Sequence, residues 1–292
     1  MMLERIKAVD THVHIQIDDS GRFGASPEQR EAMDRYFGSS EPVRTIDETA
    51  DYYRERDLMA VVFTVDATTN TGHAPNSIDD IAAGAARHAD TLIAFGSVDP
   101  LQGDAAIEEM HRQARELGVK GFKFHPTVQG FDPSAPEFVP LFAAIEDLDL
   151  PIVVHTGQTG VGAGVPGGLG LRLRLSNPML LDDVAARHPG LRIILAHPSV
   201  PWQDEALSIA THKANVWIDL SGWSPKYFSP ELVRATRTYL RHKMLFGSDF
   251  PAITPDRWLR DFAALELPDE VQQLVLKDNA VRLLGLDDGA AQ

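Results

Sequence analysis

Histidine and aspartate residues stand at the ends of several short apolar segments of this 292-residue sequence. The first segment carries His12 and His14, and side chains two residues apart on a strand point to the same side. His155, His197 and Asp249 occupy the same kind of position after later segments. Imidazole nitrogens and carboxylate oxygens, without sulfur, are ligands that suit zinc, manganese or iron. The pattern predicts that these side chains bind a divalent cation.

Each of these residues also has an explanation that involves no metal. A histidine at a strand end can be a hydrogen-bonded core residue, and an aspartate there can cap the following helix. Their coincidence favours a cation, because buried ionisable groups cost several kcal/mol unless they are paired or coordinated. Lys123 and His125, which end the fourth segment, are further candidates for the pocket or for a second metal.

Eight apolar, β-branched segments are expected to form the strands that position these residues. Several are apolar on both faces, which is typical of parallel strands buried on both sides. The segments are Ala8–Ile15, Ala60–Val65, Leu92–Val98, Val119–Phe124, Ile152–His155, Arg192–Ala196, Val216–Leu220 and Met244–Phe246.

Segments with helical periodicity alternate with the expected strands. Ser77 precedes one of them as a capping residue, and Asn177-Pro178 and Ser229-Pro230 each place a cap before proline at the first helical position. Strand followed by helix, eight times, favours a single (β/α)8 TIM barrel of the metal-dependent hydrolase type over residues 1–292. A doubly wound open sheet is the alternative, although no G-x-G-x-x-G turn follows the first strand.

Three connections are longer than a barrel requires, and all follow the carboxyl ends of strands, where barrel active sites lie. They are residues 16–50, 126–136 and the glycine-rich stretch 157–178. The last is expected to close part of the pocket. Arg172 and Arg174 could bind a substrate carboxylate or phosphate there, or could be solvated charges, and Trp223 could stack an aromatic substrate or pack the barrel rim.

Composition narrows the choice of partners and location. The formal charge of −15 argues against binding nucleic acid or an anionic membrane. The absence of cysteine excludes disulfides and thiolate metal sites. No segment resembles a signal peptide or a membrane span. We therefore expect a cytoplasmic protein with a small-molecule substrate.

Several phrases resemble one protein family. The H-x-H at His12/His14, the histidines after the fifth and sixth strands and the aspartate after the eighth resemble the amidohydrolase superfamily. IILAHP (193–198), LFGSDFP (245–251) and DNAVRLLG (278–285) are most similar to its amidohydrolase-related branch. That branch includes aminocarboxymuconate-semialdehyde decarboxylase, aromatic acid decarboxylases and lactone or C–C bond hydrolases.

The resemblance implies roles for individual residues. The metal ligands would be His12, His14, His155 and Asp249, and His197 would be catalytic beside a metal-activated water. Lys123 resembles the lysine that other branches carbamylate to bridge two metals. One ion is favoured because the branch is mononuclear, with zinc expected first and manganese as the alternative. Family members are commonly dimers or tetramers, which implies a homo-oligomer.

The implied activity is hydrolysis by a metal-activated water, acting on an ester, a lactone, an amide or a C–C bond next to a carbonyl. The substrate would be small and carboxylated or aromatic. His197 would act as general acid–base, and Asp249 would be both ligand and base.

A nonoxidative decarboxylase with the same metal site is the alternative. Several decarboxylases of the branch have glutamate in place of the first histidine, so the intact H-x-H favours hydrolysis. A purely structural metal site is a third possibility, against which the glycine-rich loop argues.

Overall fold

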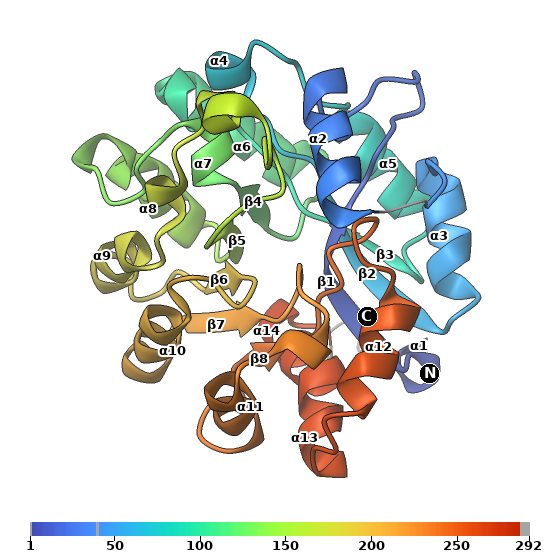
Figure 1. The fold of residues 1–292 in the computed structure, drawn as a ribbon. Helices are drawn as coiled ribbons and strands as arrows, with labels where there is room; N and C mark the ends of the chain where they lie inside the picture. The colour runs from blue at the N-terminus through green and yellow to red at the C-terminus, as the bar shows by residue number, and fades with distance from the viewer. Residues whose placement is uncertain (1, 39–40, 287–292) are drawn as a thin grey trace.

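Eight parallel strands alternate with helices in the computed structural model, which describes residues 2–38 and 41–286 (Figure 1). The predicted (β/α)8 barrel is confirmed. The strands are β1 (Ala8–His14), β2 (Leu58–Phe63), β3 (Leu92–Ala94), β4 (Phe122–Phe124), β5 (Ile152–His155), β6 (Ile193–Ala196), β7 (Val216–Asp219) and β8 (Met244–Leu245).

Two parallel ladders make up the barrel wall. One has the order β1-β2-β3 and the other β4-β5-β6-β7-β8. Single parallel bridges join them at both seams, Gly96 with Phe122 and Val13 with Phe250. Glycine is needed at the first seam, because a Cβ on Gly96 would lie 2.7 Å from the Phe122 ring. The second seam brings the first strand beside the segment that follows the last.

The alternation of side chains along the strands separates two cores. In β2, Leu58, Ala60 and Val62 belong to the larger hydrophobic cluster, which includes the helices. Met59, Val61 and Phe63 belong to a second cluster shared with residues of other strands. Every residue of β2 is buried, as expected for a strand that is covered on both faces.

Two of the three predicted caps begin a helix, whereas the helix Met179–Arg187 begins one residue later than predicted, with Pro178 rather than Asn177 at the cap position. Ser77 and Ser229 accept hydrogen bonds from the backbone N–H groups of Asp80 and Leu232. The last helical segment consists of two α-helices with a π-helical turn between them, and Gly285 caps its end. The α-helices are α1 (Met2–Arg5), α2 (Pro27–Phe37), α3 (Ile46–Arg54), α4 (Thr68–Thr71), α5 (Ile78–Arg87), α6 (Asp104–Glu116), α7 (Pro126–Gln129), α8 (Val139–Asp147), α9 (Met179–Arg187), α10 (Gln203–His212), α11 (Pro230–Arg237), α12 (Pro255–Ala263), α13 (Asp269–Gln273) and α14 (Asn279–Leu284).

The connection after β1 is more ordered than a long loop. It holds α2 and α3, and each helix begins with a complete capping box, Ser26 with Gln29 and Thr45 with Glu48. The glycine-rich connection after β5 contains only short 3₁₀ turns, at Pro166–Gly170 and Leu173–Ser176. Within the described residues, no helix is long and apolar enough to cross a bilayer.

Candidate active site

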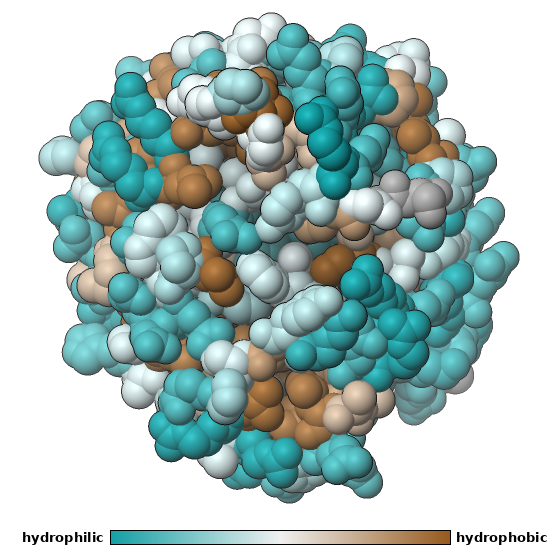
Figure 2. Space-filling model, viewed as in Figure 1, coloured by the Kyte–Doolittle hydropathy of each residue, from teal (hydrophilic) through white to brown (hydrophobic). Residues whose placement is uncertain are grey.

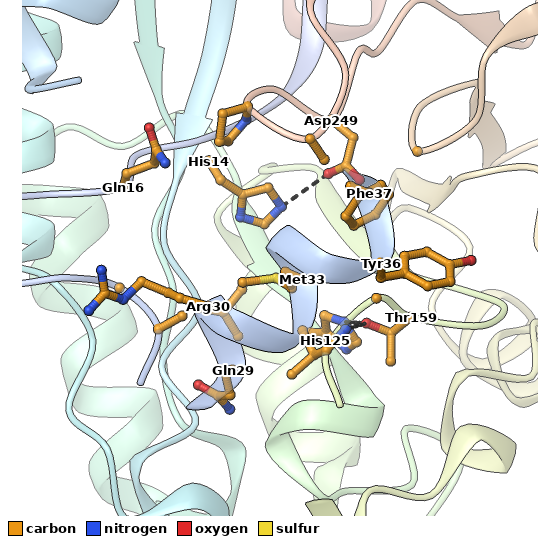
Figure 3. A pocket seen from close by; sticks show the side chains of 18 of the residues that line it. His14, Gln16, Gln29, Arg30, Met33, Tyr36, Phe37, His125, Thr159 and Asp249 are labelled. Atoms are coloured by element: carbon orange, nitrogen blue, oxygen red, sulfur yellow. Dashed lines mark hydrogen bonds and ion pairs between the residues drawn. The ribbon is translucent and has the colours of Figure 1, made fainter. Parts of the chain in front are cut away.

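Side chains from the first and last strands meet at the carboxyl end of the barrel. The Nε2 atoms of His12 and His14 lie 3.5 Å and 3.4 Å from Oδ1 of Asp249. One ligand atom from each of the three residues lies within 4.8 Å of the others. Figure 3 shows His14 and Asp249 facing each other at the edge of the pocket. The H-x-H spacing therefore places both imidazoles beside the same carboxylate, as predicted.

The backbone at two of the predicted site residues adopts an unusual conformation. His197 and Asp249 have φ angles of 74° and 69°, in the left-handed region that costs a side-chain-bearing residue about 1–3 kcal/mol. Their N–H groups are held by hydrogen bonds, from Asp249 to the carbonyl of His12 (3.0 Å) and from His197 to Oδ1 of Asp219 (3.3 Å). These bonds stabilise the left-handed conformation of both residues at the barrel mouth.

His155 and His197 form the second half of the cluster. Nε2 of His197 lies 2.9 Å from Nδ1 of His155. The His155 ring also stacks on His125, with 3.7 Å between the ring centroids. Nε2 of His155 is buried and has no hydrogen-bond partner in the described structure. A buried nitrogen without a partner beside further nitrogen and oxygen donors fits a metal ligand.

Burial sets the charge state of these groups. It lowers the pKa of His12 and His155 well below the ordinary value, and the positive charge of Lys123 lowers both further. Both rings are therefore neutral, as ligation requires. Burial alone would raise the pKa of Asp249, but the hydrogen bond from His14 and the neighbouring histidines lower it below its usual range. His12, His155 and Asp249 thus offer two neutral imidazoles and one carboxylate, donors that suit a divalent cation.

Lys123 is fully buried behind this cluster. Its Nζ lies 3.0 Å from Nε2 of His12 and 4.9 Å from the centroid of the Phe63 ring. Burial lowers the pKa of Lys123 to about 8, although Asp219 and Asp249 oppose the shift. The lysine thus contacts a predicted metal ligand. That this lysine is unmodified, beside a single metal, stays a prediction, and carbamylation with a second metal is its alternative.

Two residues that the sequence analysis did not single out complete the site. Oδ2 of Asp219, the last residue of β7, lies 2.8 Å from Nδ1 of His12. The Ser221 hydroxyl lies 2.8 Å from Nδ1 of His197 and donates to Asp219. The missed signal was the sequence DLS at 219–221, which places a carboxylate at a strand end like Asp249.

A cavity of about 310 Å³ opens beside the cluster, within the size range of small-molecule sites. Its polar side includes His14, His125, His155, His197 and Asp249. Apolar side chains of α2 and of the segment before it also line the cavity, including Phe23, Met33 and Phe37. In Figure 3, Met33 on α2 lies between the His14–Asp249 pair and His125 with Thr159.

Seen from the side of Figure 1, the surface is largely hydrophilic, with hydrophobic residues in separate small groups (Figure 2).

The other predicted substrate contacts divide into two groups. Trp223 lines the cavity, as do Gln158 to Val161 at the start of the glycine-rich connection. That connection therefore forms part of the pocket wall. Arg172 and Arg174 are exposed and do not line the cavity. The 3₁₀ turn that follows Arg172 and contains Arg174 buries Leu175 and Ser176 instead, so the expectation that these arginines approach a substrate anion does not hold in this structure. Arg30 on α2 is the arginine that lines the cavity.

Comparison with known proteins identifies the family. A sequence profile of the amidohydrolase family matches residues 9–286. The chain belongs to the amidohydrolase family. As an amidohydrolase it is an enzyme, and the histidine–aspartate cluster gives it a site able to hold a metal. The predicted resemblance to the amidohydrolase-related branch is confirmed.

Individual relatives refine this placement. The gamma-resorcylate decarboxylase of Rhodococcus jostii is 26% identical over 258 residues, covering 72% of this chain and 75% of the relative. An uncharacterised TIM-barrel protein of Bordetella bronchiseptica superposes with a TM-score of 0.75 at 20% identity, over 95% of this chain and 98% of that one. A dihydroxybenzoic acid decarboxylase of Polaromonas, solved with manganese and 2-nitroresorcinol, superposes with a TM-score of 0.66 at 16% identity, over 97% and 98% of the two chains.

Proposed function

We propose that this amidohydrolase is a nonoxidative carboxy-lyase that removes carbon dioxide from a small hydroxylated aromatic acid. The observation that carries this proposal is the similarity to gamma-resorcylate decarboxylase over about three quarters of both chains. The cavity supports it, because an aromatic ring would fit against Phe23, Met33 and Trp223 with its polar groups toward the histidines. The whole chain would act as one catalytic domain.

The proposed ligands of one divalent ion are His12, His14, His155 and Asp249. Manganese is supported by the ion in the Polaromonas relative, and zinc by the nitrogen-rich donor set. When bound, the ion would supply positive charge that holds the substrate carboxylate and a neighbouring hydroxyl oxygen. The described residues then have two tasks, to orient the ring and to move one proton.

His197 is the candidate for the proton transfer. Burial lowers its pKa, against the opposing effect of Asp249 and Asp219, so the imidazole is neutral and can take the proton of a phenolic hydroxyl. Returning that proton to the ring carbon that bears the carboxylate makes a new C–H bond. The C–C bond to the carboxylate then breaks, its electron pair enters the ring, and carbon dioxide leaves. Solvent finally protonates the phenolate, so one proton is consumed for each carbon dioxide released.

A direct assay tests this proposal. Purified protein reconstituted with Mn²⁺ or Zn²⁺ is incubated with 2,6-dihydroxybenzoate and related hydroxybenzoates, and carbon dioxide and the phenol are measured together. Release of both in equal amounts supports the carboxy-lyase. Acid formation from lactones or esters, without carbon dioxide from any hydroxybenzoate, would contradict it.

Hydrolysis is the second candidate, and one observation favours it. The chain keeps histidine at position 12, where several decarboxylases of the branch have glutamate, and this ring is fully buried against Asp219. The same pocket would then hold a lactone, an ester or an activated carbonyl compound. The lactone and ester arm of the assay measures this activity directly.

A further inference from the structure

Two residues at the end of β7 and just after it form hydrogen bonds with histidines of the cluster. Asp219 and Ser221 are both completely buried. Oδ2 of Asp219 lies 2.8 Å from Nδ1 of His12, and Oγ of Ser221 lies 2.8 Å from Nδ1 of His197. The two side chains also bond to each other, with the serine hydroxyl donating to Oδ1 of the aspartate.

The direction of these bonds fixes where the protons lie. A carboxylate only accepts hydrogen bonds, so His12 donates through Nδ1–H. The proton of Ser221 is committed to Asp219, so the serine oxygen accepts from Nδ1–H of His197. In both rings the lone pair is then on Nε2. Nε2 of His12 faces Asp249 at 3.5 Å, and Nε2 of His197 faces Nδ1 of His155 at 2.9 Å.

Two glycines of the surrounding backbone leave room for the side chains of this hydrogen-bond network. A Cβ on Gly222, whose φ is +72°, would lie 2.6 Å from Nδ1 of His197. A Cβ on Gly247 would lie 2.9 Å from Cβ of Ser221 and 3.1 Å from Oδ1 of Asp219. Gly222 thus leaves room for the ring of His197, and Gly247 leaves room for Ser221 and Asp219.

We propose that Asp219 and Ser221 are positioning residues that select the Nδ1–H tautomer of His12 and His197 and so direct both Nε2 lone pairs into the site. Carboxylates that hold a metal-binding histidine in this way typically contribute a factor of about 10–100 to metal affinity. The proposal rests on the proposed metal site, but not on which reaction the enzyme catalyses.

Asp219→Asn is the decisive variant, because the local donors dictate the orientation of the amide. Oδ1 of Asp219 accepts from the backbone N–H groups of His197 (3.3 Å) and Ser221 (3.0 Å). The amide oxygen must therefore take this position, and the NH₂ group then faces Nδ1 of His12. A donor there favours transfer of the His12 proton to Nε2, the nitrogen that the ion would need and that lies 3.0 Å from Nζ of Lys123.

Asp10→Asn is a matched control at the same end of the barrel. Asp10 is also completely buried, and its Oδ1 accepts from the backbone N–H groups of His12 and Ser248. Its Oδ2 instead faces the hydroxyl groups of Ser248 and Tyr53. A hydroxyl can turn to accept a hydrogen bond from an amide. This substitution therefore removes a buried carboxyl group without moving a histidine proton from one ring nitrogen to the other.

Two measurements test the proposal. Metal-free protein is titrated with Mn²⁺ or Zn²⁺ alone, and Asp219→Asn should raise Kd about 10–100-fold while Asp10→Asn leaves it unchanged. ¹⁵N spectra of histidine-labelled, metal-free protein should show His12 protonated at Nδ1 in the wild type and at Nε2 in Asp219→Asn. Ser221→Ala should leave Kd unchanged and alter the His197 signals, while His12, whose Nδ1 lies 3.1 Å from the serine Oγ, keeps its proton on Nδ1 through Asp219.

The outcomes separate this proposal from the proposed function. Unchanged metal affinity in Asp219→Asn, or equal losses in Asp219→Asn and Asp10→Asn, would overturn the role of Asp219. A wild-type protein that binds neither ion would contradict the metal site, whereas the spectra of metal-free protein would still decide the tautomer.

Discussion

Nε2 of His14 and Oδ1 of Asp249 lie 3.4 Å apart, although one residue ends the first strand and the other follows the last. Backbone hydrogen bonds hold them there, from His14 N–H to the carbonyl of Phe250 and from Asp249 N–H to the carbonyl of His12, at 2.9 Å and 3.0 Å. The hydrogen bonds that close the barrel at this seam therefore also hold His14 and Asp249 beside each other.

The first prediction concerns metal content. We expect close to one divalent ion per chain by elemental analysis, and we expect His14→Ala or Asp249→Ala to lose it. Removing the ion with a chelator should lower the thermal midpoint, because an ion at about 100 times its Kd stabilises the folded state by about 2.7 kcal/mol. His212→Ala, at the exposed end of α10, is the control and should keep the ion. A chelator that changes neither stability nor activity would refute the metal site.

The second prediction separates His197 from the ligands. His197→Ala should keep its ion, and turnover should fall by about two to four orders of magnitude with little change in KM, as expected when general acid–base catalysis is lost. Metal content and steady-state kinetics measured on one preparation would check this. Loss of the ion in this variant would instead make His197 a ligand and would favour a two-metal site with carbamylated Lys123.

The third prediction concerns pH and stability. Burial alone would raise the pKa of Asp18, but bonds from the Ser20 hydroxyl and from the backbone N–H groups of Ser20, Arg22 and Ser77 lower it below its ordinary 3.8. A lowered folded-state pKa stabilises the protein above the unfolded value, and this contribution is lost as the pH falls through the folded value. Asp18→Asn should therefore cost about 1–3 kcal/mol at pH 7.

Urea unfolding between pH 7 and pH 3 would measure this effect. The difference between wild type and Asp18→Asn should narrow below about pH 4, where the wild-type carboxyl in the unfolded chain is protonated. Asp183→Asn, at an exposed position on α9, is the control and should have little effect at any pH. A difference that stays constant down to pH 3 would show that the charge of Asp18 is not the cause.

The fourth prediction contrasts the cavity wall with the exposed arginines. Met33→Ala should raise KM about tenfold, because a buried apolar side chain contributes about 1.5–3 kcal/mol and 1.4 kcal/mol corresponds to a factor of ten. Arg172→Gln and Arg174→Gln should leave KM unchanged, since neither residue lines the cavity. An increase in KM for either arginine variant alone would place that residue at the substrate after all.

The barrel could be predicted from sequence because its strands carry a strong local signal. Ile152–His155 was predicted with the bounds that the structure shows, and Ala8–Ile15 differs by one residue. The third strand is much shorter than predicted and ends at Ala94, because Gly96 bridges to Phe122 at a seam between the two ladders. A seam depends on partners distant in sequence, so no local pattern predicts it.

The site was partly predictable for the same reason. Strand ends locate His12, His14 and Asp249, and the structure brings them together. Asp219 stands in an equivalent position, yet its role depends on the ring of His12 from another strand. The arginines illustrate the opposite error. The run LRLRLSNP suggests a pocket contact by charge alone, whereas burial of Leu175 and Ser176 determines which side chains of this turn face solvent.

Helix α2 has a consequence for how specificity can change. Its own capping box at Ser26 and Gln29 begins it, and Gly38 ends it in the left-handed conformation, so its termini depend on local residues rather than on the barrel. The same helix contributes Met33 and Phe37 to the cavity. Part of the cavity wall thus comes from a short helix with its own caps, separate from the strand ends that carry the histidines and Asp249. A library confined to the cavity-facing positions of α2, or a graft of the corresponding helix from a relative, would redirect substrate choice while the reactive groups stay untouched.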